Sequence, residues 1–165
     1  MDERIREHTF TWHDPRETIR QIGGKPHLEW MAEMIAGRVP PPPFAYVMGY
    51  SFDEAEPGRI RFSVAPAEWT ANPTGVVHGG FTTALLDTVM TLAVVTKLPV
   101  ERTATTLDLQ IHFVRPATPG NGKLLAEATA VHIGSTIGTA EGRIADQEGR
   151  LIAHGTATMA IISPR

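Results

Sequence analysis

Residues 72–80 read NPTGVVHGG, and the chain continues as FTTALLDTVMTLAVVT through residue 96. Gly75, Gly79 and Gly80 allow the backbone to turn tightly and to approach a ligand closely. The part that follows contains no glycine or proline before Pro99. This segment therefore predicts a glycine-rich turn that leads into a helix of about four or five turns.

The predicted helix is apolar almost all round, which is unusual for a helix on a protein surface. Two stripes at helical spacing are hydrophobic, and they contain Phe81, Leu85, Val89, Leu86, Met90 and Val94. A helix of this kind must be buried on more than one side. Its one charged residue is Asp87, and no Lys or Arg lies within helical reach of it. Because a carboxylate buried without a partner is costly, Asp87 is the first candidate for a functional residue.

Composition limits the classes of protein that need to be considered. The 165 residues correspond to one domain, and the formal net charge of -3 with a pI near 6.1 argues against a nucleic-acid partner. No window is apolar over the length of a membrane span, and the N-terminus is charged rather than signal-like. The chain has no cysteine, which excludes thiolate nucleophiles and cysteine metal sites. We expect a cytoplasmic protein that binds neither nucleic acid nor membrane.

The first 43 residues are predicted to form a helical extension that ends in a proline linker. Asp14 is a candidate N-cap, with Pro15 at the first helical position and Glu17 completing a capping box before Gly23 ends the helix. A second short helix is predicted over 26–36, and the prolines at 40–43 predict a stiff spacer. We therefore divide the chain into an extension over 1–43 and a main domain over 44–165.

Alternating hydrophobic residues predict six strands in the main domain. Two precede the helix, at 44–52 and 59–64, and the residues 53–58 are expected to connect them as a turn. Four follow it, at 105–114, 123–133, 137–146 and 150–162. One curved antiparallel sheet can cover only one side of the helix. A second copy of the chain is the economical way to cover the other side, which predicts a homo-oligomer.

The pattern Asn72-x-x-Gly75-x-x-His78-Gly79-Gly80, followed by six residues and Asp87, resembles the signature of the hotdog-fold acyl-CoA thioesterases in their phenylacetate-pathway subfamily. Residues 106–117 (TLDLQIHFVRPA) and 149–154 (GRLIAH) resemble the strand after the helix and the closing hairpin of that family. The resemblance covers residues 44–162. It implies an α+β hotdog fold, in which a curved antiparallel sheet wraps around one long central helix.

The resemblance also implies a reaction and a set of catalytic residues. The reaction is hydrolysis of the thioester of an acyl-CoA with an apolar or aromatic acyl group, with coenzyme A as part of the substrate and no other cofactor or metal. Asp87 would be the general base or nucleophile, and the Gly79 N–H would bind the thioester oxygen. His78 would donate a hydrogen bond or brace the turn, Asn72 would hold water or the carbonyl, and Thr106 would orient the water.

The spacing of His78 and Asp87 bears on the assembly. His78 and Asp87 are about half a turn apart around an ideal helix, so they are poorly placed to cooperate within one chain. The resemblance implies a homodimer or homotetramer with composite active sites, in which the carboxylate faces the glycine turn of the other subunit.

Thr106 shares its parity with Asp108, Gln110 and His112 on the polar face of its strand. An irregularity at the start of the strand would be needed to turn Thr106 toward the helix.

Candidates for binding coenzyme A are less specific. In related thioesterases the region of Ser135 and Thr136 contacts the nucleotide, and Arg115 and Arg143 could meet its phosphates. The family normally has glycine followed by basic residues where this chain has Ser135 and Thr136. Two alternative functions stay open: a non-catalytic acyl-CoA-binding protein, such as a sensor or scaffold, and a hotdog dehydratase, which uses a different His/Asp arrangement.

Overall fold

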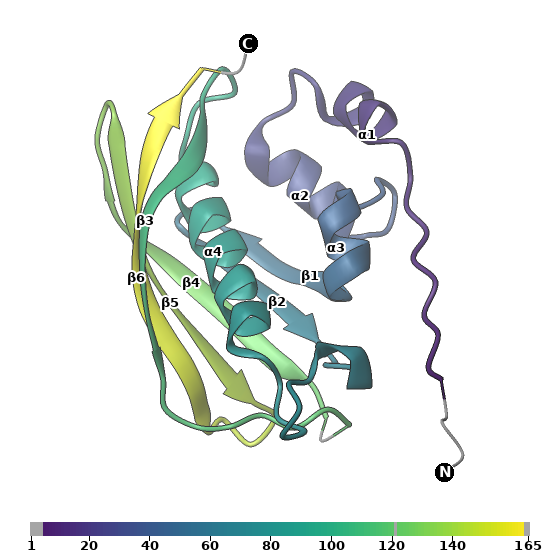
Figure 1. Cartoon of the computed structure of the whole chain (residues 1–165). Coiled ribbons are helices and arrows are strands. Elements are labelled where there is room, and N and C mark those ends of the chain that lie inside the picture. Colours follow the sequence, from purple (N-terminus) through teal and green to yellow (C-terminus); the bar gives the residue numbers. More distant parts are fainter. Residues whose placement is uncertain (1–4, 121, 164–165) are drawn as a thin grey trace.

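The computed structural model describes residues 5–120 and 122–163, and its centre is a six-stranded antiparallel sheet that curves around one helix, α4 (Gly79–Val95) (Figure 1). The strand order is β1-β2-β4-β5-β6-β3. The strands are β1 (Tyr50–Glu56), β2 (Arg59–Val64), β3 (Thr103–Phe113), β4 (Leu124–Ile133), β5 (Ile137–Asp146) and β6 (Leu151–Ile162). This arrangement confirms the predicted α+β hotdog fold and the long central helix.

Close contact between α4 and the sheet depends on two glycines in β5. A side chain at Gly142 would come within 2.8 Å of Met90, and one at Gly138 within 2.7 Å of Val94. Because neither glycine carries a side chain, the sheet backbone lies directly against the helix. Leu86, Val89 and Met90 are fully buried on this side.

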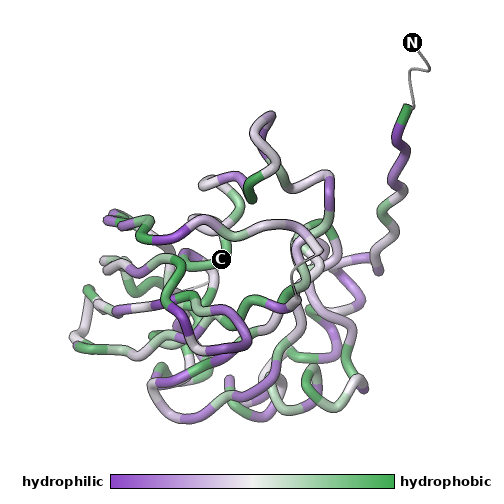
Figure 2. The backbone as a smooth tube through the Cα atoms, turned by 90° about the horizontal axis from the view of Figure 1, so that it is seen from below, coloured by the Kyte–Doolittle hydropathy of each residue, from purple (hydrophilic) through white to green (hydrophobic). Residues whose placement is uncertain are grey.

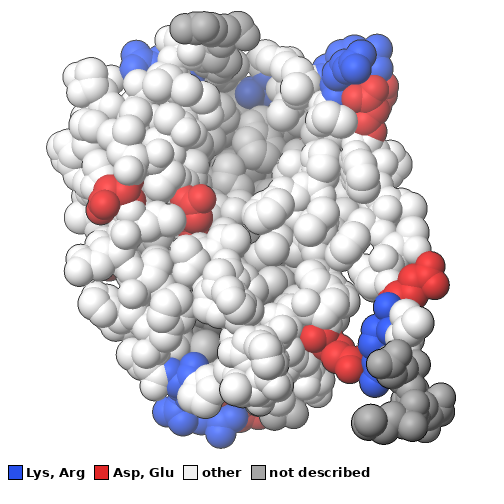
Figure 3. All heavy atoms as spheres, viewed as in Figure 1, with Lys and Arg blue, Asp and Glu red and all other residues white. Residues whose placement is uncertain are grey.

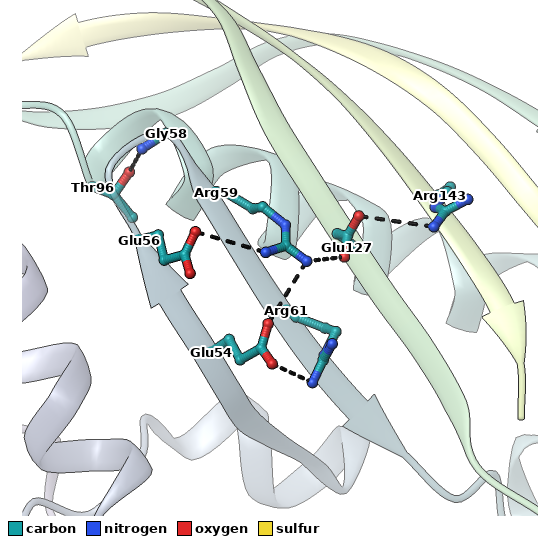
Figure 4. Close-up of polar contacts among 8 residues, drawn as sticks. All are labelled: Glu54, Glu56, Gly58, Arg59, Arg61, Thr96, Glu127 and Arg143. Carbon is teal, nitrogen blue, oxygen red and sulfur yellow. Dashed lines mark hydrogen bonds and ion pairs between the residues drawn. The ribbon is translucent and has the colours of Figure 1, made fainter.

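The C-terminal end of α4 is tied to the β1–β2 turn through Thr96. Its hydroxyl accepts a 2.7 Å hydrogen bond from the Gly58 N–H and donates one to the Ala93 carbonyl oxygen (Figure 4). Gly58 has φ +82°, a conformation that glycine adopts without strain. The helix is therefore fixed at this end independently of its packing on the sheet.

β3 forms one edge of the sheet and pairs only with β6 among the described residues. The register of this pairing shifts between Thr106 and Asp108, so Leu107 is the extra residue of a β-bulge. This bulge is the irregularity that was needed to turn the Thr106 side chain toward the helix. Leu107 and Phe113 are 61% and 56% exposed, which gives this edge strand an apolar surface.

The N-terminal extension folds against the main domain. It contains α1 (Pro15–Ile22) and α2 (His27–Ile35), and α2 packs on β1 beside α4 (Figure 1). Met31 of α2 is completely buried, and Met34 nearly so. His27 Nε2 lies 2.9 Å from the Arg102 carbonyl oxygen in the connection between α4 and β3. The N-terminal helices thus cover part of the apolar surface that the sequence led us to expect a second copy of the chain to cover. The division of the chain at residue 43 stays a prediction.

The structure corrects the predictions for residues 44–58. The predicted strand 44–52 is wrong over its first half, where α3 (Pro43–Met48) forms instead. Proline at the first helical position and Gly49 in the left-handed conformation (φ +73°) are signals of a helix start and end. The predicted turn 53–58 is also wrong in extent, because β1 continues to Glu56 and the turn comprises only residues 57 and 58.

A smaller correction concerns the cap of α1. Asp14 is the N-cap as predicted, since its Oδ1 accepts a 2.9 Å hydrogen bond from the Arg16 N–H. Glu17 does not complete a capping box, because its carboxylate pairs with Arg20 one turn along the helix. The helix start was therefore predictable, and the partner of Glu17 was not.

The outer face of the sheet carries a network of charged side chains. Arg59 reaches Glu54, Glu56 and Glu127, and Arg61 reaches Glu54 (Figure 4). Ion pairs at this exposure contribute little to stability. On the face that shows α4 and the N-terminal helices, charged side chains are sparse (Figure 3). Along the backbone, hydrophilic and hydrophobic residues follow one another in short stretches (Figure 2). No helix in the described part of the chain is long and apolar enough to cross a membrane.

Candidate active site

The glycine-rich turn before α4 is a closed loop held by its own side chains. Asn72 Oδ1 accepts hydrogen bonds from the Thr74 N–H at 3.0 Å and from the Thr74 hydroxyl at 2.5 Å. Ala71 and Val77 pair across the loop, and Gly75 has φ +79°. The carbonyl oxygen of the Asn72 side chain is thus occupied within the turn, which leaves only its NH₂ group for other partners.

The backbone N–H groups at the start of α4 differ in whether they have a hydrogen-bond acceptor among the described residues. His78 is the N-cap, and its Nδ1 accepts a 2.9 Å hydrogen bond from the Gly80 N–H. The Phe81 N–H bonds to the His78 carbonyl oxygen. The Gly79 N–H has no acceptor among the described residues. It therefore remains available at the positive end of the helix dipole.

The contact with Gly80 also determines the tautomer of His78. An imidazole nitrogen that accepts a hydrogen bond carries no proton, so Nδ1 is unprotonated and Nε2 carries the proton of the neutral ring. The His78 side chain is exposed. It therefore braces the turn through Nδ1 and can donate through Nε2, and both roles considered from the sequence are compatible with this geometry.

The second cluster lies in the middle of α4 and joins it to β3. The Thr106 hydroxyl donates a 2.5 Å hydrogen bond to Asp87 Oδ1, and the Thr91 hydroxyl lies 3.0 Å from Thr106 Oγ1. Because the single proton of Thr106 points to Asp87, Thr91 is the donor in the second bond. The order of donation is therefore Thr91 to Thr106 to Asp87.

The environment of Asp87 differs from that expected. The sequence indicated a carboxylate buried without a partner, but Asp87 is only half-buried and has a partner in Thr106. A hydrogen bond from a hydroxyl stabilises the ionised form of a carboxylate. Oδ2 has no partner among the described residues. One oxygen of the carboxylate is thus held in place, and the other can accept a proton.

The two clusters are separated within one chain. Gly79 and Asp87 are eight residues apart on a continuous helix, which corresponds to about 12 Å along its axis. A thioester carbonyl is only a few ångströms across, so a single chain cannot apply the Gly79 N–H and the Asp87 carboxylate to the same group. The separation agrees with the conclusion drawn for His78 and Asp87 from helical geometry.

A hollow of about 300 Å³ lies beside Gly79. Phe113 of β3 covers the glycine from one side, and a side chain at position 79 would meet its ring at 3.3 Å. The hollow is also lined by Thr82 and by Arg115, whose Nε donates to the Leu151 carbonyl oxygen. Gly79 therefore lines an open space with one aromatic wall and one cation at its edge.

The four candidates for binding coenzyme A do not come together in one chain. Arg115 lies by Gly79, whereas Ser135 and Thr136 are in the β4–β5 turn, near the other end of α4. Arg143 is on the outer face of the sheet, 3.9 Å from Glu127. Ser135 and Thr136 are exposed, and their backbone carbonyl oxygens accept from Arg102 and the Ile161 N–H. Of these four residues, Arg115 is the one that lines the hollow.

Two residues of the site were missed in the sequence. Thr91 lies one helical turn from Asp87, a spacing at which side chains share a face, so it could have been found. Phe113 ends β3, and its position over Gly79 depends on how the strand curves around the helix, which the sequence does not specify. Within the described residues no group of three or more His, Cys, Asp or Glu side chains could hold a metal ion.

Curated relatives cover the central part of the chain. A protein of Halobacterium salinarum is 38% identical over 57% of this chain and 64% of its own length, and one of Haemophilus influenzae is 32% identical over 57% and 67%. Both carry the provisional name esterase. The chain thus spans slightly less than two thirds of the first relative.

A solved structure agrees with this similarity over a longer stretch. A phenylacetic acid degradation-related protein of Ralstonia eutropha, which carries the provisional name thioesterase, is 29% identical with a TM-score of 0.71, over 79% of this chain and 98% of that one. The family model of the thioesterase superfamily matches residues 74–153, which include the glycine turn, α4 and β3. The chain therefore belongs to the thioesterase superfamily, as the signature from Asn72 to Asp87 predicted.

Proposed function

We propose that this protein hydrolyses acyl-CoA thioesters in a homodimer, at sites that combine the Gly79 N–H of one subunit with the partner's Asp87. Membership of the thioesterase superfamily supports the reaction class. The observation that carries the site is the Thr106–Asp87 hydrogen bond, which fixes one carboxylate oxygen on the β3 side of α4. The acyl group is apolar or aromatic in this proposal, because the surface beside these residues is apolar.

The proposed chemistry needs one donor and one base. The Gly79 N–H binds the thioester oxygen and stabilises the negative charge that develops on it. His78 donates from Nε2 at the rim of the same turn, and the NH₂ group of Asn72 holds the attacking water or the carbonyl. Asp87 takes the proton of the water through Oδ2, while Thr106 keeps Oδ1 in place. Asp87 acting as a nucleophile uses the same two partners.

A second copy of the chain is supported by three features of the β3 side. The donor and the carboxylate are about 12 Å apart along α4 in one chain. β3 is an edge strand, and its backbone groups on the outer side are unpaired among the described residues. Leu107 and Phe113 on this strand are more than half exposed, although they are large and apolar. An isologous contact along this edge would cover these groups and complete two sites.

In the proposed complex the coenzyme A portion lies in the hollow beside Gly79. Arg115 lines the hollow and offers a guanidinium to a phosphate. The proposal includes three further residues only if the partner subunit brings its own copies close to this hollow: Ser135, Thr136 and Arg143. Whether the assembly is a dimer or a homotetramer follows from its measured mass.

The test is release of free thiol from a panel of acyl-CoAs by the wild type and by Asp87→Asn. We expect the wild type to release coenzyme A, with a preference for aromatic or medium-length acyl groups, and the variant to lose at least ~10³-fold in kcat, comparable to loss of a principal catalytic group. Glu141→Gln, an exposed carboxylate on the outer face of the sheet, is the matched control. Equal rates in wild type and Asp87→Asn would remove Asp87 from the chemistry.

The same assay separates the enzyme from the alternatives. Binding of acyl-CoA without thiol release by any of the proteins would establish the non-catalytic sensor. Loss of water from a 3-hydroxyacyl-CoA without thiol release would establish the dehydratase. Single-turnover hydrolysis in ¹⁸O water then tests the nucleophilic role of Asp87. Label in the Asp87 side chain requires a mixed anhydride that water opens at the aspartyl carbonyl, and a general base never forms such an anhydride.

A further inference from the structure

Residues 5–13, which precede α1, form an extended strap without helix or strand (Figure 1). The strap contacts η1 (Glu68–Thr70), a short 3-10 helix that leads into the glycine-rich turn. Arg6 Nε donates hydrogen bonds of 3.2 and 3.0 Å to the two carboxylate oxygens of Glu68. Both side chains are exposed, so this ion pair contributes little to the attachment. The attachment therefore depends mainly on the apolar contacts of the strap.

These contacts are made by aromatic rings around Trp69 of η1. The Phe10 ring packs edge-on against the Trp69 ring at a centroid distance of 5.2 Å, and the His8 ring lies 5.3 Å from Trp69. His8 and Phe10 also contact each other, at 4.4 Å. An aromatic pair at such a distance shifts an equilibrium by roughly 2- to 12-fold. The strap thus restricts the position of Trp69 through two rings.

Trp69 is in turn connected to the first turn of α4. Its ring lies 6.5 Å from the ring of Phe81, again edge to face, and Phe81 is buried. The next residue, Thr70, accepts a 2.9 Å hydrogen bond from the His78 N–H through its carbonyl oxygen. Trp69 therefore reaches the start of the helix by two routes, through its own ring and through the adjacent backbone.

Both routes lead to the peptide group that contains the Gly79 N–H. The Phe81 N–H donates a 2.9 Å hydrogen bond to the His78 carbonyl oxygen. Because a trans peptide group is planar, its carbonyl and its N–H point in opposite directions. The bond from Phe81 therefore fixes the direction of the Gly79 N–H, and a displacement of Phe81 would turn this donor.

We propose that Trp69 is a positioning residue for the Gly79 N–H, and that the strap holds Trp69 in this role. The inference rests on the proposed function, in which the Gly79 N–H binds the thioester oxygen. A displacement of about 1 Å at a reacting group can cost up to ~10²-fold in rate. Since the oxyanion develops only in the transition state, a disordered donor lowers kcat and leaves KM almost unchanged.

The experiment compares Phe10→Ala with Trp12→Ala, a matched control on the same strap. Trp12 is 57% exposed and has no aromatic partner among the described residues. We expect Phe10→Ala to lower kcat for thiol release from acyl-CoA by roughly 2- to 12-fold, the value of one aromatic pair, at nearly constant KM. Trp12→Ala should match the wild type in both constants.

Changes at Trp69 itself should have the larger effect. Trp69→Ala removes the ring that contacts both the strap and Phe81, and it should lower kcat by ~10- to 10²-fold. Trp69→Phe keeps an aromatic ring at this position and should restore most of the activity. This rescue separates positioning by the ring from a general loss of stability, because kcat is measured per folded molecule.

Amide hydrogen exchange tests the positioning independently of activity. The Gly80 N–H is bonded to His78 Nδ1 in the same turn. Its exchange should be faster in Phe10→Ala by roughly 2- to 12-fold, whereas amides in the middle of β5, which pairs on both sides, should be unchanged. If the wild type releases no thiol, the proposed function fails, and the exchange rates still decide whether the strap orders the turn.

Two results would overturn the inference. The first is a Gly80 exchange rate that is the same in the wild type, Phe10→Ala and Trp69→Ala, which would show that the strap does not order the turn. The second is a kcat per folded molecule that is unchanged in Trp69→Ala while the wild type is active. The strap and Trp69 would then only stabilise the fold.

Discussion

The two flanks of α4 differ in how the chain completes them. On the flank toward β1, the N-terminal helices cover the helix, and Met31 and Met34 are buried there. On the flank toward β3, Thr106 and Thr91 order the one carboxylate of the helix, and the apolar edge strand beside them is exposed. One flank is finished by the chain itself, and the other presents polar groups at a surface that a single chain leaves open.

This difference bears on which side of α4 the proposed active site and the proposed subunit contact lie. On the β1 side, α2 of the extension packs on the sheet. The β3 side retains an unpaired strand edge, exposed hydrophobic residues and the two halves of the proposed site. The sequence predicted that a second copy covers the helix, and this assembly stays a prediction.

The largest effect on the β3 flank is expected from removal of the Gly79 N–H at the start of α4. Gly79→Pro deletes the N–H, and proline is well tolerated at the first position of a helix. His78 already has the extended conformation that a following proline requires. We expect kcat for thioester hydrolysis to fall ~10²–10³-fold, as when an oxyanion donor is lost.

The control for this variant is Gly79→Ala, which keeps the N–H. Both substitutions introduce a Cβ at about 3.3 Å from the Phe113 ring, so they share the crowding that this atom causes. A large loss in the proline variant alone would identify the N–H as the donor. A similar loss in both would attribute the effect to the displaced aromatic ring.

The next effect concerns the bond that orders Asp87. Thr106→Val removes the hydroxyl at nearly constant volume, and Asp87 loses its one recorded partner. Since a hydrogen bond to a charged group is worth ~1.5–3 kcal/mol, we expect kcat/KM to fall roughly 10- to 100-fold. Thr106→Ser keeps the hydroxyl and should retain most of the activity. Equal rates in the valine and serine variants would contradict a role for this bond.

The position of Thr106 shows what the sequence could and could not predict. The helix from the glycine turn, its single carboxylate and the strands after it follow from apolar periodicity and from glycine and proline positions. Strict alternation, however, placed Thr106 on the polar face of its strand. The bulge at Leu107 reverses this orientation, and a bulge interrupts the very period on which such a prediction rests.

The N-terminal half of the molecule was less predictable for a different reason. The helix α3 carries clear end signals in Pro43 and Gly49, but its short continuous run of apolar residues also matches a strand. Where α1 and α2 lie depends on long-range contacts, such as that of His27 with the Arg102 carbonyl oxygen, which no local pattern encodes.

A variant on the β1 flank should affect stability without affecting chemistry. Met31→Ala removes a fully buried side chain and should lower the free energy of unfolding by ~2–5 kcal/mol. Ile35→Ala, on the same helix but 38% exposed, should change it by only about 0.5 kcal/mol. Denaturant unfolding measures both. If kcat per folded molecule fell with Met31→Ala, the two flanks would not be independent.

The smallest expected effect concerns acid unfolding, which has to be separated from any loss of activity at acid pH. Burial alone would raise the pKa of the Asp146 carboxyl, but hydrogen bonds from Arg150 and its positive charge outweigh this, so the pKa lies below its ordinary value. A carboxyl with a depressed pKa in the folded state stabilises the fold above the pKa of the unfolded chain, about 3.9. That contribution is lost as the pH falls below this value.

We therefore expect the melting temperature to decrease as the pH is lowered below about 4, and to do so less steeply in Asp146→Asn, which has no carboxyl to protonate. Arg150→Gln should flatten the same dependence, because it removes the group that lowers the pKa. Both variants lie in the β5–β6 turn, apart from Asp87. If activity declined at a pH where the wild type is still fully folded, the decline would report on the β3 flank of α4. If activity and folding were lost together and shifted together in Asp146→Asn, acid inactivation would be a property of the fold and would carry no information on the proposed role of Asp87.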